Sequence, residues 1–208
     1  MTDRTRLDRR QALKALAAGT LAGATFTQVG SAAAGEHDGT PLQFVPKTAP
    51  DPTPLEDELA KYPKCPYCGM DRKQWHHSRH LVHYADDLVD ATCSIHCAAL
   101  SLAINLDRGP KAIYAADYGA SAEPKPMINV DEATYLIGSK QKGTMTKVSK
   151  LAFSSADAAK AMQAQEGGEL GDFGAALKAA YLSMADDTMM IRKKREERRQ
   201  KMMEHPKG

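Results

Sequence analysis

The feature that most constrains the fold is an order of expected elements that occurs twice along the chain. In the first half, the stretch "RHLVHYADDLVDATCS" alternates enough to predict a hairpin with strands at 81–84 and 88–92. Apolar residues at helical spacing predict a helix over 95–107, and "KAIYAADY" at 111–118 predicts a third strand. The first half is therefore expected to run strand, strand, helix, strand.

The second half follows the same order. "ATYLIGS" and "KVSKLAFSS" predict two strands, "ADAAKAMQAQ" predicts a helix, and "ELGDF" predicts a short strand. Two similar units of about 45 residues suggest an internal duplication, although few residues are identical between them. We predict an α+β fold of two ββαβ units packed together, at 59–120 and 121–173, followed by a long C-terminal helix with a basic tail at 174–208.

Capping and breaking residues set the expected helix boundaries. Ser94 is placed to cap the first helix, and Gly109-Pro110 to stop it. Ser154 or Ser155 is placed to start the second helix, and Gly167-Gly168 to stop it. In the last helix Leu177, Ala180, Tyr181 and Met184 are expected to face the core, whereas "IRKKREERRQK" is charged all round and is expected to project into solvent or onto a partner.

The N-terminus has the pattern of an export signal. Paired Arg9 and Arg10 precede a weakly apolar run and then "SAAAGE", which predicts a Tat-type signal over residues 1–34 with cleavage after Ala33 or Ala34. An amphipathic N-terminal helix would leave the alanine run unexplained. The mature chain is therefore expected in the periplasm or another extracytoplasmic compartment. No later apolar run approaches the ~20 residues of a membrane span, and the proline-rich linker at 35–58 is expected to be extended and solvated.

Charge is unevenly distributed along the mature chain. Residues 35–191 contain 21 acidic and 15 basic residues, a balance of −6, whereas residues 192–208 contain 8 basic and 3 acidic residues, a balance of +5. An acidic body argues against a nucleic-acid-binding protein. The basic run at the end is more often a solvated helix face, with partner docking as the alternative.

The four cysteines fall into two close pairs, Cys65 with Cys68 and Cys93 with Cys97. An even count in an oxidising compartment first suggests two disulfides. A C-x-x-C bridge, however, closes too short a loop to stabilise the fold much. Cross-pairing stays open, because Cys97 in the first turn of a helix is expected to point back toward the preceding strand. A thioredoxin-type redox pair is less favoured, since no apolar helix follows "CPYCGM".

Two metals fit the same cysteines. C-x2-C and C-x3-C with 24 residues between them are close to the spacing of a four-thiolate zinc site. Cu(I) prefers thiolate and thioether donors, and it would also use Met70, two residues past Cys68, if Gly69 lets the backbone turn tightly. Zinc leaves Met70 and the nearby histidines without a role.

The motifs together resemble the NosL family of nitrous oxide reductase accessory proteins. "CPYCGM", the hairpin, the helix with Cys97, "YLIGSKQKGTM" and "AFSSADAAKAMQAQEGGEL" carry the resemblance, which covers about 62–173. It implies an exported copper-binding protein with two ββαβ units and a role in maturing the copper centres of nitrous oxide reductase. The family's ligands fall on Cys68 and Met70 of the C-G-M element and on Met145 of "GTM". Cys65 is a candidate fourth donor.

Several residues depart from the family pattern. Many members are lipoproteins, but here Ala34 or Gly35 stands at the cleavage site, so no lipid anchor is expected. Cys93, Cys97 and His96 of "CSIHC" are additional candidate ligands, either for a second ion with Cys65 or buried beside the motif. Four other histidines lie around the first strand: His76, His77, His80 and His83. Most of them are expected on the surface, and His77 or His80 is a candidate auxiliary ligand. Trp75 is expected to cover the motif. The tail is also additional to the family, with Met189, Met190, Met202, Met203 and His205.

The sequence therefore predicts a Cu(I) metallochaperone rather than an enzyme, with zinc as the alternative ion. It shows neither a nucleophile–base constellation nor a phosphate loop. The expected partners are a copper-receiving client resembling nitrous oxide reductase and a membrane copper-supply complex, with no nucleic acid and no small-molecule substrate. A thiol–disulfide redox protein and a zinc-stabilised binding module are the competing hypotheses.

Overall fold

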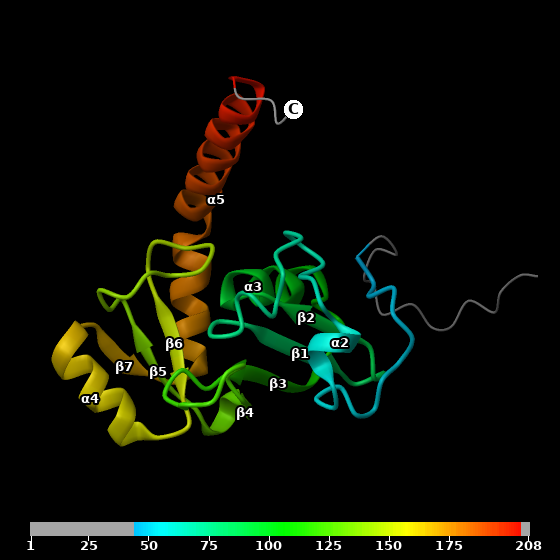
Figure 1. Ribbon diagram of the computed structural model, residues 1–208. Helices are drawn as coiled ribbons and strands as arrows, with labels where there is room; N and C mark the ends of the chain where they lie inside the picture. The colour runs from blue at the N-terminus through cyan, green and yellow to red at the C-terminus, as the bar shows by residue number, and fades with distance from the viewer. Residues whose placement is uncertain (1–43, 205–208) are drawn as a thin grey trace, which may run out of the picture. The chain divides into compact units, whose positions relative to one another are not determined.

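A computed structural model describes residues 44–204 of the chain. The predicted signal at 1–34, the start of the linker and His205 lie outside the described residues. Four antiparallel strands form the first sheet in the order β2-β1-β3-β4 (Figure 1). Their bounds are His80–Tyr84 for β1, Val89–Thr92 for β2, Pro110–Ala116 for β3 and Met127–Asn129 for β4.

The second sheet has three antiparallel strands in the order β6-β5-β7. Its strands are β5 (Thr134–Ile137), β6 (Lys150–Phe153) and β7 (Glu169–Gly171). Helix α3 (Ile95–Ile104) follows β2, and helix α4 (Ala156–Glu166) follows β6. In each unit the first strand is central, with the second strand on one side and the strand after the helix on the other, so the predicted α+β fold is confirmed.

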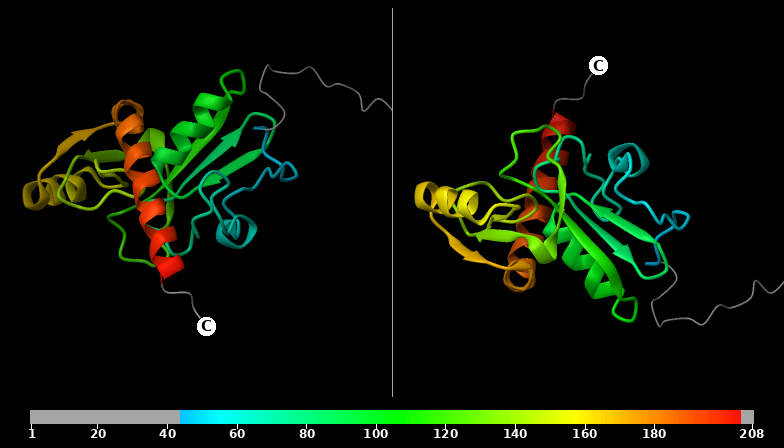
Figure 2. Two further views of the ribbon diagram at one scale, coloured as in Figure 1. Left: turned by 90° about the horizontal axis from the view of Figure 1, so that it is seen from above. Right: turned by 90° about the horizontal axis from the view of Figure 1, so that it is seen from below.

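The long helix α5 (Phe173–Glu204) is a shared element of both units. It packs against α3 of the first unit and against β5 and β7 of the second. The two views in Figure 2 show it running between the sheets, and its C-terminal half continues beyond them (Figure 1). Its 32 residues give it a length of about 48 Å. No helix within residues 44–204 is both long and apolar enough to cross a membrane.

One hydrophobic core joins the two units. β1 is buried along its whole length, because Val82 and Tyr84 face the shared core and Leu81 faces a second cluster with Tyr62 on the other side of the sheet. Residues of both sheets and of the helices α3 and α5 meet in the shared core, among them Val82, Ile95, Tyr135, Ala152 and Ala180. The units are also tied by Tyr118, whose N–H donates to the carbonyl of Ala152 at 2.7 Å.

Four local features differ from the sequence expectations. The edge strand β4, the one-turn helix α2 (Glu58–Lys61) and a 3-10 turn (Val130–Glu132) were not predicted. Helix α3 ends at Ile104 rather than at Asp107, because Asn105 takes the C-cap position and donates from both its backbone and its side chain to the carbonyl of Ser101.

The described part of the proline-rich segment is also less solvated than predicted. Asp51 donates its backbone N–H to the carbonyl of Asp87 at 2.7 Å, and its carboxylate accepts from Lys61 and Tyr62, both at 2.6 Å. Pro54 is buried. This stretch is therefore fastened to the first unit.

Candidate metal centre

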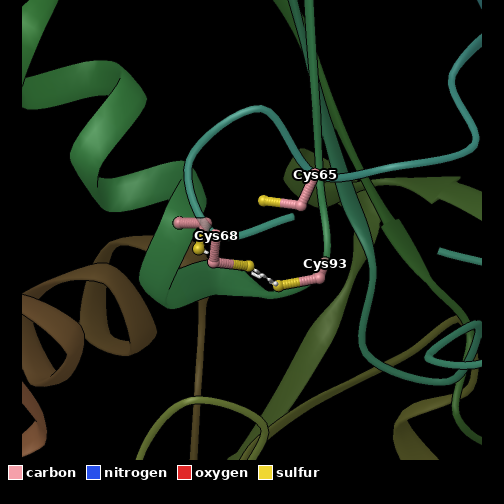
Figure 3. Close-up of side chains that lie close together, drawn as sticks. Cys65, Cys68 and Cys93 are labelled. Carbon is pink, nitrogen blue, oxygen red and sulfur yellow. Dashed lines mark hydrogen bonds between the residues drawn. The ribbon is translucent and has the colours of Figure 1, made fainter. Parts of the chain in front are cut away.

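The four cysteines come from two segments that the β1–β2 hairpin brings together. Cys65 and Cys68 lie in the segment between α2 and β1, which we call the cysteine loop (residues 62–79). Cys93 directly follows β2, and Cys97 lies in the first turn of α3. Figure 3 shows the sulfur of Cys68 pointing toward that of Cys93, with the side chain of Cys65 beside them. The cysteines are free thiols, so the structure contains neither of the disulfide pairings considered above.

The sulfur positions match those around a single ion. All four Sγ atoms lie within 4.8 Å of one another. The Sγ of Cys93 is 3.3 Å from that of Cys68 and 3.8 Å from that of Cys97. Four sulfurs placed about 2.3 Å from a central ion in a tetrahedron would be about 3.8 Å apart. The thiols therefore fit metal binding with little rearrangement of the backbone.

The cysteine loop is held in shape by its own backbone. The N–H of Cys65 donates to the carbonyl of Met70, and the N–H of Gly69 donates to the carbonyl of Cys65, both at 2.9 Å. Gly69 has a φ of 75°, in the left-handed region that glycine adopts without steric cost. The tight turn expected at Gly69 is present, and it returns Met70 toward the cysteines.

A buried ion-pair network fastens the cysteine loop to the sheet. Arg72 is fully buried, and its guanidinium lies 2.7 Å from the Glu58 carboxylate. The same guanidinium donates to the carbonyls of Tyr62 at 2.7 Å and Thr92 at 3.2 Å, so it joins the loop to the end of β2 beside Cys93. Arg79 pairs with the second oxygen of Glu58, also at 2.7 Å. Sequence reasoning missed this network, since nothing in the spacing of these residues links them.

The thiols differ in exposure and acidity. Cys65, Cys93 and Cys97 are buried, whereas Cys68 is half-buried. Hydrogen bonds from Cys68, Cys93 and Cys97 lower the pKa of Cys65, although burial opposes the shift. Hydrogen bonding to Cys65 is also the largest cause that raises the pKa of Cys93 and of Cys97. The thiols therefore form one hydrogen-bonded group whose members influence one another's pKa.

Two thioethers adjoin the cysteine cluster. The Sδ of Met70 lies 3.9 Å from the Sγ of Cys93. Met145 packs against the same cluster from the segment between β5 and β6, which we call the methionine loop (residues 138–149). The structure thus brings six of the candidate ligands together, and which of them bind an ion stays a prediction; they are Cys65, Cys68, Cys93, Cys97, Met70 and Met145.

The methionine loop is anchored on α5. Asp187 is buried, and its carboxylate accepts from the N–H of Lys147 at 3.0 Å and from the hydroxyl of Ser183 at 2.7 Å. The Nζ of Lys150 donates to the carbonyl of Val148 at 2.9 Å. Met145 itself has a φ of 62°, an unfavourable conformation for a side chain of its size. These contacts hold a strained residue beside the thiols.

A groove of about 890 Å³ opens onto this cluster. It is lined by residues of three segments, including Cys68, Met70, Trp75, Met145, Met190 and Arg195. Cys68 is the one cysteine in the groove lining, so it lies between the buried thiols and the opening. A guanidinium nitrogen of Arg195 lies 3.4 Å from the carbonyl oxygen of Cys68. The cluster is therefore accessible from one side.

The sequence model of the NosL family matches residues 56–181, about 60% of the chain. The chain belongs to the NosL family. The crystal structure of the copper chaperone NosL from Shewanella denitrificans is similar, at 26% sequence identity, with 53% of this chain and 87% of that chain covered and a TM-score of 0.45. No curated protein matches the chain.

The NosL match contains the whole cysteine cluster and the methionine loop, but it ends inside α5. The residues of α5 that line the groove, from Met190 onward, lie beyond the match. The charged end of this helix is exposed, as the sequence predicts, and part of it also lines the groove. The α5 residues from Met190 to Arg199, which begin about two turns beyond the match, contribute to the groove that opens onto the cysteine cluster.

The histidines that the structure describes are not part of the four-cysteine cluster. Among the described residues, the group of four sulfurs includes no imidazole. His80 is buried, bonds to Ser78 and Tyr135, and has its pKa lowered to about 4 by burial. His83 is buried against Asp87 at 2.8 Å. Their expected exposure is wrong, because β1 is buried on both faces.

The other three histidines within residues 44–204 contact groups outside the cluster. His76 accepts from the N–H of Lys125, and His77 contacts the rings of Trp75 and Tyr118. His96 is buried, with its Nδ1 3.8 Å from the carboxylate of Asp187 on α5. Ligand roles for His96, and for His77 or His80 as an auxiliary donor, stay predictions.

Proposed function

We propose that this NosL-family chain is an exported Cu(I) metallochaperone that delivers copper to a client enzyme resembling nitrous oxide reductase. One observation carries the proposal: four thiols within 4.8 Å adjoin two thioethers at the end of an open groove. Such a donor set is soft throughout, and Cu(I) is the biological ion that best suits thiolate and thioether sulfur.

The arrangement supports transfer of the ion more than permanent storage. Cys65, Cys93 and Cys97 hold their sulfurs inside the protein, but Cys68, Met70 and Met145 line the groove. Cu(I) needs only two or three such ligands, and a thioether is a neutral, weak donor. A receiving protein is expected to displace the groove-side sulfurs first. We assign the chain no catalytic step, since binding and release of the ion account for these groups.

A structural zinc site is the second candidate. The four Sγ positions approach the tetrahedral spacing of a four-cysteine zinc site, and three of the four thiols are buried. Zinc would leave Met70 and Met145 without a role. A thiol–disulfide redox role is less favoured, because Cys65 and Cys68 lie in a loop whose next residues form turns, not a helix that would activate a thiol.

The test is a competition titration of the reduced, metal-free mature protein with a Cu(I) chelator. The proposal predicts tight binding of Cu(I), weakened by about tenfold in Met70→Ala and in Met145→Ala because each loses one weak donor. Met189→Ala is the matched control, since Met189 is exposed on α5 and does not line the groove.

Two results would contradict the ligand assignment. Retention of full Cu(I) affinity in both methionine variants would remove the thioethers from the site. Purification of the native protein with one zinc ion that Cu(I) does not displace would favour the structural zinc site.

A further inference from the structure

The groove that opens onto the metal centre is strongly basic. Five of its lining residues are cationic and one, Asp71, is acidic; the cations are Lys64, Lys194, Arg195, Arg198 and Arg199. Four of the five come from α5, in the part of the helix that lies beyond the NosL match. The positive charge is therefore concentrated on one wall, which we call the basic wall (Lys194, Arg195, Arg198 and Arg199).

Few carboxylates pair with the cations of the basic wall. Arg199 pairs with Glu196 of the same helix. Within residues 44–204, no carboxylate forms an ion pair with Lys194, Arg195 or Arg198. All four cations are exposed. Exposed, unpaired charges in a concave site raise the local concentration of ligands of opposite charge.

The position of the basic wall is set by the fold. Asp187, two turns earlier on α5, holds the methionine loop through Lys147. Arg195 reaches the carbonyl of Cys68 in the cysteine loop. The helix is thus attached to both loops that supply sulfur, and its cations face the path by which a second protein would reach Cys68.

A basic wall is an unexpected neighbour for a cation-binding site. It repels a free copper ion, so it does not assist capture of the ion from solution. It does favour an approaching surface that is acidic, and such a surface in the groove would lie next to Cys68, Met70 and Met145. A lipid headgroup would be attracted by the same charges but has no donor to exchange with these sulfurs.

From this arrangement we propose that the basic wall of α5 binds an acidic segment of the protein with which this chain exchanges its metal ion. The proposal rests on the proposed function and extends it by naming the chemistry of the partner's contact surface. The contact places the acidic segment over Cys68, and its strength falls with ionic strength because the charges are exposed.

A labelled oligoglutamate peptide, with an oligoglutamine peptide as its neutral counterpart, tests the proposal on the reduced, metal-free mature protein. The test variant is Lys194→Gln/Arg198→Gln, which removes two cations from the groove. The matched control is Arg192→Gln/Lys193→Gln, which removes the same charge from the same helix outside the groove lining. Glutamine keeps the helix, as circular dichroism of both variants would verify.

The expected result is selective loss in the test variant. Fluorescence anisotropy at low ionic strength should show oligoglutamate binding weakened about tenfold by Lys194→Gln/Arg198→Gln and much less by the control. Oligoglutamate should also slow the alkylation of Cys68 by iodoacetamide, followed by mass spectrometry, in the wild type and the control but not in the test variant.

Three outcomes would overturn the proposal. Equal losses in the two variants would mean that only net charge matters. Peptide binding without protection of Cys68 would place the acidic segment elsewhere. Phosphatidylglycerol vesicles that bind with the same dependence on Lys194 and Arg198, when oligoglutamate does not bind, would assign the wall to a membrane surface.

Both readouts use the metal-free protein, so they are separate from the copper titration. A chain that passes the peptide test but takes up no Cu(I) would refute the proposed function and keep the acidic-partner surface. The reverse pattern would keep copper binding and remove the basic wall from it.

Discussion

The two ββαβ units have the same strand order, but the turn between the second strand and the helix differs in chemistry. In the second unit, Ser154 follows β6, and the hydroxyl of Ser155 accepts from the N–H of Ala158 as an ordinary N-cap. In the first unit, Cys93 occupies the position of Ser154, and Ser94 makes no side-chain cap bond to α3. The first unit therefore lacks the side-chain helix cap of the second unit and has the thiol of Cys93 at the equivalent turn.

The comparison indicates how one scaffold can take two roles. A capping hydroxyl typically stabilises a helix by about 1 kcal/mol. In the first unit, the cysteine turn is held by the Glu58–Arg72–Arg79 network and by the hydrogen-bonded cysteine loop. The second unit has a capped helix and adds one thioether, Met145, to its partner's site. Specialisation of one unit for metal and the other for support follows from these differences.

The largest expected effect concerns the network that only the first unit has. Arg72→Met leaves the buried Glu58 with one of its two cationic partners, and we expect it to lower the free energy of unfolding by about 3–5 kcal/mol. The matched change in the second unit is Lys160→Met, which breaks the exposed pair with Asp157 and should cost under about 0.5 kcal/mol. Urea denaturation of both reduced, metal-free variants measures the difference. Similar losses in the two variants would remove the special role of the buried network.

A second prediction compares the equivalent positions after β2 and β6. Cys93→Ser removes a sulfur that lies within 3.9 Å of those of Cys68, Cys97 and Met70, and we expect at least about a 100-fold loss of Cu(I) affinity. Ser154→Ala should leave the Cu(I) affinity unchanged, although it removes a 2.5 Å hydrogen bond to Asp117 and so lowers stability. Chelator competition measures the affinity, and thermal unfolding measures the stability. Unaltered affinity in Cys93→Ser would exclude Cys93 as a ligand.

Much of this comparison was predictable from the sequence, because local patterns specify it. Alternation in "RHLVHYADDLVDATCS", the serines before each helix and Gly167 gave the main elements of both units with small errors at the boundaries. The strand β4 was missed because Met127–Asn129 is short and follows the proline-rich "EPKP". Its pairing with β3 is a tertiary contact that no local sequence pattern predicts.

The metal centre was predictable only in part. The closeness of Cys65, Cys68 and Met70 follows from their spacing, but the choice among disulfides, zinc and copper stayed open in the residue pattern. Met145 entered only through the family resemblance. The approach of Arg195 to Cys68 joins residues 127 positions apart in the chain. The sequence of the basic run does not indicate which part of the fold the long helix brings it next to. The groove beside Cys68 could therefore not be predicted.

A third prediction separates stability from binding at Met145. Its left-handed backbone should cost about 1 kcal/mol or more in a residue with a side chain. We therefore expect Met145→Gly to be about 1 kcal/mol more stable than Met145→Ala, while both bind Cu(I) about tenfold more weakly than the wild type. Denaturation and chelator competition on the same samples measure both quantities. Equal stability of the two variants would mean that the backbone at 145 carries no strain.

The smallest expected effect concerns the N-terminal segment that only the first unit has. Hydrogen bonds from Lys61 and Tyr62 lower the pKa of Asp51 from 3.8 to about 2. A carboxyl whose pKa falls on folding stabilises the folded state above its unfolded pKa, and this contribution is lost as the pH drops toward the folded pKa. Asp51→Asn should therefore be less stable than the wild type by at most about 1 kcal/mol near neutral pH, because the contact is near the surface.

The difference between wild type and Asp51→Asn should shrink as the pH falls from 3.8 to about 2. Denaturation curves of the two proteins across this range measure it. In the second unit Asp157→Asn, at the exposed pair with Lys160, is the control and should change stability less at every pH. A stability difference for Asp51→Asn that stayed constant down to the lowest pH would show that the segment is held by its backbone bond to Asp87 and not by the carboxylate. The extra segment of the first unit would then be a steric cover and not an electrostatic anchor.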